Sequence, residues 1–269
     1  MTINSVAIVT GASQGIGRAA AVRLARDFAA VVLTARNEGK LQTTATAVAS
    51  AGAEPLVYPL DLREAASADI VVKGTLGRFG RIDALLNIAG AVPQIDLFEM
   101  TDAQWDDGMA LKLHGARRLT TRAWDALKLA RGSVVLISGS AALDPKPGFA
   151  AVAATNAAII ALAKAFAEQG IRDGVQVNSV VPGAVMTGRR RPFLKNGRRP
   201  TADGGRGDRP IPARGWHQPL WQGGGDCRPD GLSGVALGEV DDGSFCTHGR
   251  WRNQRHLELS HRSETELDL

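Results

Sequence analysis

The sequence predicts an α/β fold, a doubly wound parallel sheet, over about the first 188 residues, followed by an irregular C-terminal tail of disordered composition. Three observations support this prediction. Short apolar runs rich in β-branched residues alternate with longer stretches of helical spacing, which is typical of βαβ units. The first run leads directly into a glycine-rich turn. The composition then changes abruptly near residue 188.

About six strands are predicted in the first part of the chain. In order, they lie in residues 6–12 (VAIVTGA), 29–36 (AAVVLTAR), 54–61 (EPLVYPLD), 81–90 (RIDALLNIAG), 132–139 (GSVVLISG) and 175–183 (VQVNSVVPG). Between them lie stretches such as 16–28 and 149–169, whose apolar residues recur at helical spacing. Strands that alternate with helices imply a parallel sheet covered on both faces.

The composition of the chain is that of a globular protein. It has 269 residues, enough for one large α/β domain, of which 44% are hydrophobic and 22% charged. The first residues contain no secretory signal, and polar residues interrupt the longest apolar stretches. We therefore expect a cytoplasmic protein with no membrane partner. The two cysteines, Cys227 and Cys246, do not suggest a disulfide framework.

The glycine-rich turn, TGASQGIG at Thr10–Gly17, follows the first predicted strand and opens a helix. Its glycines at 11, 15 and 17 permit a tight turn, a close approach of the backbone to a pyrophosphate, and close helix packing. The helix N-terminus then offers free N–H groups and a positive dipole to the phosphates. The turn therefore predicts a Rossmann-like dinucleotide site; the plain alternative is an ordinary strand–helix turn.

Further segments extend the pattern: Asp61 in PLDL, NIAG at 87–90 and PGAVMT at 182–187. Together with the glycine turn, they resemble the short-chain dehydrogenase/reductase family over residues 5–188. The resemblance implies an NAD(P)-dependent oxidoreductase acting on a small carbonyl or alcohol substrate, in which Asp61 holds the adenine amino group and PGAVMT grips the nicotinamide carboxamide. The predicted cofactor-binding residues are Gly11, Ser13, Gln14, Gly15, Ile16, Gly17, Arg36, Asp61, Leu62, Asn87, Ala89, Gly90, Pro182, Gly183, Val185 and Thr187.

The choice between NADP(H) and NAD(H) depends on the end of the second strand. An acidic residue there would accept the ribose 2′-hydroxyl of NAD. This chain has Ala35 followed by Arg36, so an adenosine 2′-phosphate would meet a cation. The sequence therefore favours NADP(H), whereas the alternative is that Arg36 is a solvated residue at a helix start.

The resemblance fails at the catalytic positions, where the family usually has Asn, Ser, Tyr and Lys. Alignment without gaps puts Val152 at the Tyr position and Asn156 at the Lys position. It puts Gly139 at the Ser position and Lys112 at the Asn position. The single tyrosine, Tyr58, lies in the third predicted strand. Because loss of a positioned general acid typically costs about 10²–10⁴ in rate, we expect impaired carbonyl reduction.

Lysine and asparagine have nevertheless exchanged places, and the resemblance implies that Lys112 and Asn156 face each other near the cofactor ribose. Lys112 could then act as the acid, with Ser138 or Ser140 polarising the substrate oxygen. The alternative is that Lys112 lies on a solvated helix face. His114 is expected at the surface or in packing. A second class of function also stays open, a non-catalytic NADP(H)-binding sensor or scaffold.

The chain divides into a domain of residues 1–188 and a tail of residues 189–269. In the tail nearly every basic residue is Arg, and the segment is dense in Gly and Pro with no sustained period. Its Cys246 and His248 lack the spacing of a zinc site, so we expect no metal. Despite the net charge of +5, the Arg clusters lack interleaved aromatic residues, so no nucleic-acid partner is expected.

A frameshift near Lys195, natural or a sequencing error, is our hypothesis for this tail. Permitted codons for EVDDG, read one base later, give RWMT, and those for HGRWR give MDGG. WHQPLWQGGGDCRPD can likewise give GISRYGKAEEIADLM, and the three blocks resemble the closing segments of the same family in order. The tail as written would then lack the seventh strand, the substrate cover and the subunit interface of the family, which puts a homo-oligomer in doubt. The sixth strand would become an exposed edge.

Overall fold

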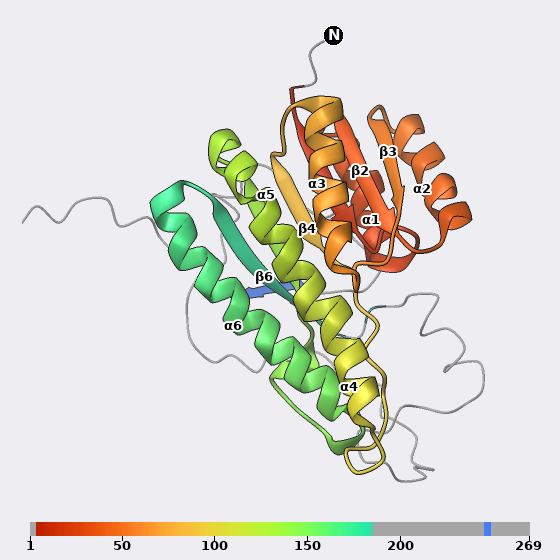
Figure 1. Ribbon diagram of the computed structural model, residues 1–269, viewed down its shortest axis with the longest axis vertical. Coiled ribbons are helices and arrows are strands. Elements are labelled where there is room, and N and C mark those ends of the chain that lie inside the picture. The colour runs from red at the N-terminus through yellow and green to blue at the C-terminus, as the bar shows by residue number, and fades with distance from the viewer. Residues whose placement is uncertain (1–3, 184, 186–244, 249–269) are drawn as a thin grey trace, which may run out of the picture.

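The computed structural model describes residues 4–183, Val185 and residues 245–248. Its strands form one sheet in the order β3-β2-β1-β4-β5-β6-β7 (Figure 1). Their bounds are Val6–Thr10 for β1, Ala30–Ala35 for β2, Glu54–Pro59 for β3, Ala84–Asn87 for β4, Ser133–Ile137 for β5, Gln176–Pro182 for β6 and Phe245–His248 for β7. Strands β1 to β6 are parallel, and each lies within one of the predicted runs. The predicted α/β fold with a parallel sheet is confirmed.

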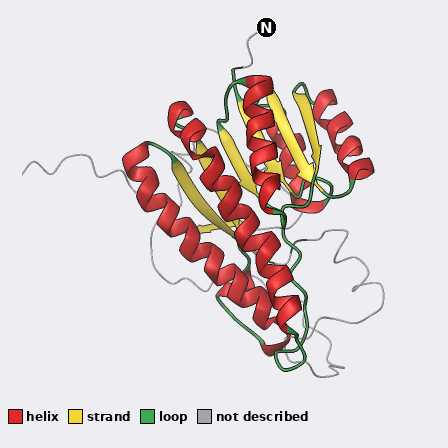
Figure 2. Ribbon diagram, in the orientation of Figure 1, coloured by secondary structure: helices red, strands yellow, loops and turns green. Residues whose placement is uncertain are grey.

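The helices lie on both faces of the sheet (Figures 1 and 2). Their bounds are Gly15–Leu24 for α1, Glu38–Ser50 for α2, Ala65–Phe79 for α3, Asp102–Met109 for α4, Ala116–Ala130 for α5 and Ala150–Asp173 for α6. Three short elements are η1 (Ala110–Gly115, a π-helix), η2 (Ser140–Ala142) and η3 (Pro147–Phe149), the last two being 3₁₀ turns. Helices α3, α5 and α6 cover one face, and α1 and α2 cover the other.

The core follows the alternation of side chains along each strand. Ile8 of β1 belongs to the cluster under α3, α5 and α6, together with Leu119 and Ile159. The next residue, Val9, belongs to the cluster under α1 and α2, together with Leu24. All five side chains are at most 1% exposed. Burial of each side chain contributes about 1.5–3 kcal/mol to the stability of the fold. The two clusters therefore hold the strands in place, and the ends of these strands carry the site.

The sheet does not end at β6, and the expectation of an exposed sixth strand is wrong. Strand β7 pairs with β6 in antiparallel register, from Ser179 opposite His248 to Pro182 opposite Phe245. An uncovered β6 would present a row of unpaired backbone groups, and β7 supplies partners for them. The predicted absence of a seventh strand is thus corrected. The rest of the predicted tail, 189–244 and 249–269, lies outside the described residues, as do the side chains of Cys246 and His248.

One helical segment within the described part of the chain, Pro147–Asp173, is long and apolar enough to span a membrane by length and composition alone. The core helix of a globular domain meets the same criteria. Ile159, Ala163 and Ala167 of this segment are buried in the cluster under α3, α5 and α6. These buried side chains make the segment a core helix of the domain.

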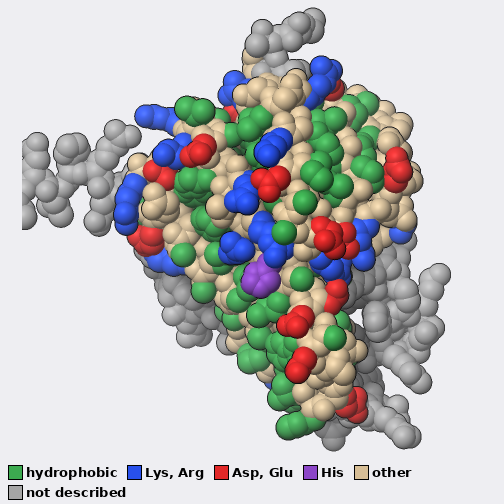
Figure 3. Space-filling view, viewed as in Figure 1, with side chains coloured by type: hydrophobic (Ala, Val, Ile, Leu, Met, Phe, Trp, Pro, Cys, Tyr) green, Lys and Arg blue, Asp and Glu red, His purple; other side chains and the backbone are tan. Residues whose placement is uncertain are grey.

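The face covered by α3 and α5 carries side chains of both charges, which lie interleaved in Figure 3. Arg122 of α5 donates to Asp69 of α3 at 2.9 Å, and Arg118 donates to the carbonyl oxygen of Arg63 at 3.0 Å. Pairs of opposite charge partly cancel each other's field. This face is therefore a mixed solvated surface and not a single-signed patch for nucleic acid.

Candidate dinucleotide and active site

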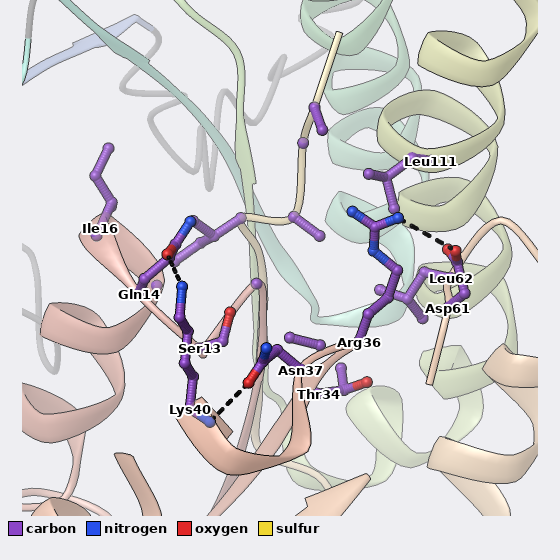
Figure 4. Close-up of a pocket in the computed structure, with 18 of the residues that line it drawn as sticks. Ser13, Gln14, Ile16, Thr34, Arg36, Asn37, Lys40, Asp61, Leu62 and Leu111 are labelled. Carbon is purple, nitrogen blue, oxygen red and sulfur yellow. Dashed lines mark hydrogen bonds and ion pairs between the residues drawn. The ribbon is translucent and has the colours of Figure 1, made fainter. Parts of the chain in front are cut away.

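A cavity of about 620 Å³ opens beside the carboxyl ends of the central strands, where ligands bind in doubly wound sheets (Figure 4). Most of the predicted cofactor residues line it, namely Gly11, Ser13, Gln14, Gly15, Ile16, Gly17, Arg36, Asp61, Leu62, Ala89 and Gly90. The lining also includes residues that sequence reasoning missed, namely Thr34, Ala35, Asn37, Lys40, Leu60, Ile88, Ala91, Leu111 and Ile137. The structure thus brings segments far apart in the sequence to one cavity.

Four of the predicted residues that the structure describes are not part of this lining. Asn87 is buried beneath the cavity, and its Nδ2 donates to Thr120 Oγ1 at 3.0 Å, so it holds β4 to α5. Pro182 ends β6, and Gly183 and Val185 follow it, outside the lining of this cavity. Thr187 lies outside the described residues.

The glycine turn packs backbone against backbone, which only glycine permits at Gly11 and Gly17. Gly11 has a φ of +67°, which favours glycine, and a Cβ at Gly17 would lie 2.2 Å from the Gly11 carbonyl oxygen. Thr10 Oγ1 accepts from the backbone N–H groups of Ile88 at 2.8 Å and Ala89 at 2.9 Å, which fixes the turn against β4. No side-chain cap satisfies the N–H groups at the start of α1, and no acidic residue lies in its first turn. These donors fit a pyrophosphate.

Gln14, which precedes α1, is hydrogen-bonded to Lys40, a cation that the sequence analysis did not identify as part of the site. Gln14 Oε1 accepts from Lys40 Nζ at 3.0 Å, across the cavity mouth (Figure 4). Asn37 caps α2 by accepting from the backbone N–H of Lys40 at 2.9 Å. Arg36 and Lys40 thus flank Asn37 at the N-terminus of α2. A cation in the first turn of a helix opposes the helix dipole, and this unusual position was the signal that could have identified Lys40.

Asp61, the predicted adenine ligand, is held by arginines. Arg63 Nη1 lies 3.3 Å from both carboxylate oxygens of Asp61, and Arg36 Nη1 lies 3.9 Å from Oδ2. Arg63 also donates from Nε and Nη2 to Asp107 of α4. These bonds lower the pKa of Asp107 and raise that of Arg63. The network fixes the loop after β3 against α4, with Asp61 at the cavity wall.

Lys112 lies in the π-helical segment η1, which joins α4 and α5 without a break. Single π turns within helices are frequent at functional sites. Lys112 Nζ donates to the carbonyl oxygen of Ser138 at 3.0 Å and to Asn156 Oδ1. Lys112 is half-buried and Asn156 is buried. The expected pairing of Lys112 and Asn156 is present, and the alternative of a solvated Lys112 is not what the structure shows.

The two candidate serines differ in what their hydroxyl groups do. Ser138 Oγ donates its single proton to the carbonyl oxygen of Asn156 at 2.8 Å, and Ser138 is buried. Its donor therefore serves the backbone of α6 in this structure, and a role for Ser138 at a substrate oxygen stays a prediction. Ser140 is exposed at the start of η2 and is the other serine candidate for that role.

The remaining positions agree with their sequence-based placement. Val152 is half-buried on α6, four residues before Asn156, so the two lie on one helical face. Tyr58 of β3 packs against Gly74 of α3, and burial raises the pKa of its hydroxyl. His114 is exposed. Within the described ranges, no group of three or more His, Cys, Asp or Glu side chains is arranged to hold a metal ion.

The sheet, the glycine turn and the cavity define a dinucleotide-binding α/β protein. The family model described as short chain dehydrogenase matches residues 5–196, and the chain belongs to that family.

Several known proteins resemble this chain in sequence. A 3-oxoacyl-[acyl-carrier-protein] reductase of Synechocystis is 35% identical over 188 residues, covering 68% of this chain and 74% of the relative. An uncharacterised oxidoreductase of Thermotoga maritima is 32% identical over 183 residues, covering 68% and 72%.

Two solved structures also resemble this chain. A metagenomic short-chain oxidoreductase in complex with NADP has a TM-score of 0.64 at 34% identity, covering 67% of this chain and 82% of that one. L-Sorbose reductase from Gluconobacter frateurii, complexed with NADPH and L-sorbose, has a TM-score of 0.68 at 28% identity, covering 73% and 78%.

Proposed function

We propose that this chain is an NADP(H)-dependent oxidoreductase that acts slowly on a small carbonyl or alcohol substrate. The observation that supports it is the contact between Lys112 and Asn156. It keeps a cation at the catalytic end of the site, although the cation now comes from η1 and not from α6.

The residues present fit a nicotinamide dinucleotide, which supplies or accepts a hydride when bound. The start of α1 and the glycine turn would hold the pyrophosphate, and Asp61 would receive the adenine. Arg36 and Lys40 would face an adenosine 2′-phosphate, since each brings a cation to the lining of the same cavity. This pair is the basis for proposing NADP(H) over NAD(H).

Proton transfer to the substrate is the step for which this chain lacks the family's usual residue. Val152 has no proton to give, so the proposal assigns that role to Lys112, with Ser140 polarising the substrate oxygen. Asn156 and the Ser138 carbonyl accept from the ammonium and orient it. The reaction is slow because a lysine held in this way replaces the family's tyrosine. A cytoplasmic location and a small-molecule substrate complete the proposal.

The first test is a titration of the purified full chain with NADPH and NADH, followed by nicotinamide fluorescence. The proposal expects saturable binding of NADPH and weaker binding of NADH. Turnover of a carbonyl and alcohol panel is then compared between the wild type, Lys112→Ala and Lys73→Ala. Lys73 is an exposed residue of α3, outside the cavity lining, and serves as the matched control.

Loss of turnover in Lys112→Ala, by about 10² or more, with Lys73→Ala unchanged, supports the proposal. Tight NADPH binding without turnover on any substrate supports the second class of function, a sensor or scaffold. Absence of binding by either nucleotide overturns both.

A further inference from the structure

Gly139 occupies the position at the end of β5 where the family has serine. Its backbone is extended, with φ 167° and ψ 154°, a conformation that any residue can adopt. The backbone therefore does not require glycine at this position. The reason for the glycine lies in the space beside it.

Asn156 occupies that space. A Cβ built on Gly139 would lie 2.7 Å from Asn156 Nδ2, closer than real Cβ atoms approach a neighbour. Asn156 is only 2% exposed and Ser138 Oγ holds its backbone carbonyl oxygen, so only the side-chain amide of Asn156 can move to make room. Its Oδ1 accepts from Lys112 Nζ. A side chain at 139 would thus rotate the amide away from the lysine.

Lys112 is confined from the other side by a second glycine. A Cβ at Gly90 would lie 3.1 Å from Lys112 Cδ, so the alkyl chain of the lysine runs over the backbone of the NIAG segment. Gly90 lines the dinucleotide cavity together with Leu111 and Ile137. The ammonium therefore lies next to that end of the cavity, held by Asn156 and by the Ser138 carbonyl.

We propose that Gly139 is a positioning residue that acts through Asn156. The absence of a side chain at 139 lets the Asn156 amide turn its oxygen to Lys112, and this holds the ammonium beside Gly90. Glycine for serine, asparagine for lysine and lysine for asparagine are then one coupled change and not three independent losses. The catalytic use of the ammonium rests on the proposed function, whereas the coupling rests on packing alone.

A double-mutant cycle on thermal unfolding tests the coupling without any substrate. Gly139→Ala lowers the Tm by about 2–4 °C or more, as expected for overpacking in a domain of this size. In the Asn156→Ala background, the same change moves the Tm by less than about 1 °C, because the Cβ then has room. Gly148→Ala is the matched control, since a Cβ there would meet nothing within 4 Å. Equal shifts in both backgrounds overturn the proposal.

A second experiment measures how readily the Lys112 amine reacts with an acetylating reagent. Lysines are acetylated with an N-hydroxysuccinimide ester, and peptide mass spectrometry gives the rate for each lysine. In the folded wild type, Lys112 reacts slowly compared with the exposed Lys73. Gly139→Ala raises the Lys112 rate several-fold and leaves the Lys73 rate unchanged, because Lys112 loses one of its acceptors, Asn156 Oδ1. A variant that is destabilised but keeps the wild-type Lys112 rate has lost only packing, and this result contradicts a positioning role.

The two readouts separate this proposal from the proposed function. Coupling in the cycle and faster labelling, together with no turnover in any variant, would support the positioning role and overturn the proposed reaction. Turnover that depends on Lys112, with no coupling between positions 139 and 156, would support the proposed reaction and overturn the positioning role of Gly139.

Discussion

Lys112 of η1 and Asn156 of α6 are hydrogen-bonded to each other, with the ammonium donating to the amide oxygen. The two residue types have exchanged helices relative to the family pattern, yet they meet. The exchange preserves a cation–amide pair while removing the tyrosine that it usually serves. Under the proposed function, Lys112 must therefore supply the proton that the tyrosine would supply.

Val152→Tyr is expected to raise NADPH-dependent carbonyl reduction by about 10²-fold or more, because a tyrosine hydroxyl would return near the Lys112 ammonium. Ala154→Tyr, an exposed position on the same helix, is the matched control and should have no effect. The measurement is NADPH oxidation with the best substrate of the panel. The gain should disappear in Val152→Tyr/Lys112→Ala, and a gain that survives there would contradict the role of the lysine.

Arg36→Leu and Lys40→Met are each expected to raise the Kd for NADPH by about 10-fold, which is typical of losing a charge-assisted contact. The Kd for NADH should stay within about two-fold, since NADH lacks the 2′-phosphate. Fluorescence titration measures both. Lys73→Met is the control for loss of a surface charge. Equal weakening of both nucleotides would assign these residues to the fold and not to cofactor choice.

Gly17→Ala is expected to abolish dinucleotide binding, because the new Cβ would meet the Gly11 carbonyl oxygen at 2.2 Å and push the turn out of shape. Gly77→Ala is the matched control, since a Cβ in this α3 position would meet nothing within 4 Å. It should stabilise the domain by roughly 0.5–1 kcal/mol through helix propensity. Wild-type binding by Gly17→Ala would show that the turn does not cradle the pyrophosphate.

Acid should weaken the contact between Arg63 and Asp107. The hydrogen bond from Arg63 lowers the pKa of Asp107 below its ordinary value of 3.8. A carboxylate with a lowered folded pKa contributes stability that is fully present above its unfolded pKa and is lost as the pH falls through the folded one. Asp107→Asn should therefore destabilise the protein near neutral pH and flatten the stability loss below about pH 4.

The effect will be small because both groups of this pair face solvent in part, with 17% and 47% of the side chains exposed. Chemical denaturation at a series of pH values measures it. Asp106→Asn, an exposed neighbour on the same helix, is the control. An Asp107→Asn profile parallel to that of the wild type would show that the pair contributes nothing.

The coding DNA tests the frameshift hypothesis. A single-base change near the codon of Lys195 should restore, in one frame, peptides resembling the closing helix and final strand of the family. Resequencing of the gene and of its transcript is the measurement. If no such change restores the three blocks in order, the hypothesis fails.

The six parallel strands and the glycine turn could be predicted because each depends on local pattern. Apolar runs of strand length, and glycines where a turn needs φ above zero, show in the sequence itself. Lys112 and Asn156 could be paired only through the resemblance, which supplied the tertiary neighbour. Nothing in the sequence near Lys40 indicates Gln14 as its acceptor, since that contact joins α2 to the loop before α1.

Other features escaped prediction because tertiary contacts decide them. The hydroxyl of Ser138 bonds to the backbone of α6, and this partner is invisible along β5. Strand β7 lies in a part of the sequence with no sustained hydrophobic period, and it is its pairing with β6 that makes it a strand. In the sequence, Gly139 is simply a position where the family's serine is missing. The structure shows that Asn156 occupies the space that a side chain at 139 would need.

The distance in sequence between β6 and β7 has a consequence for the order of assembly. Residues 183–244 separate the two strands, so their pairing must close a long loop before any backbone bond forms. The entropy cost of loop closure rises with loop length and delays distant contacts, whereas β1 to β6 join through shorter connections that contain helices. Strand β7 should therefore pair with β6 only after the other six strands have formed the sheet. In native-state hydrogen exchange, its amides should open long before those of the central strands.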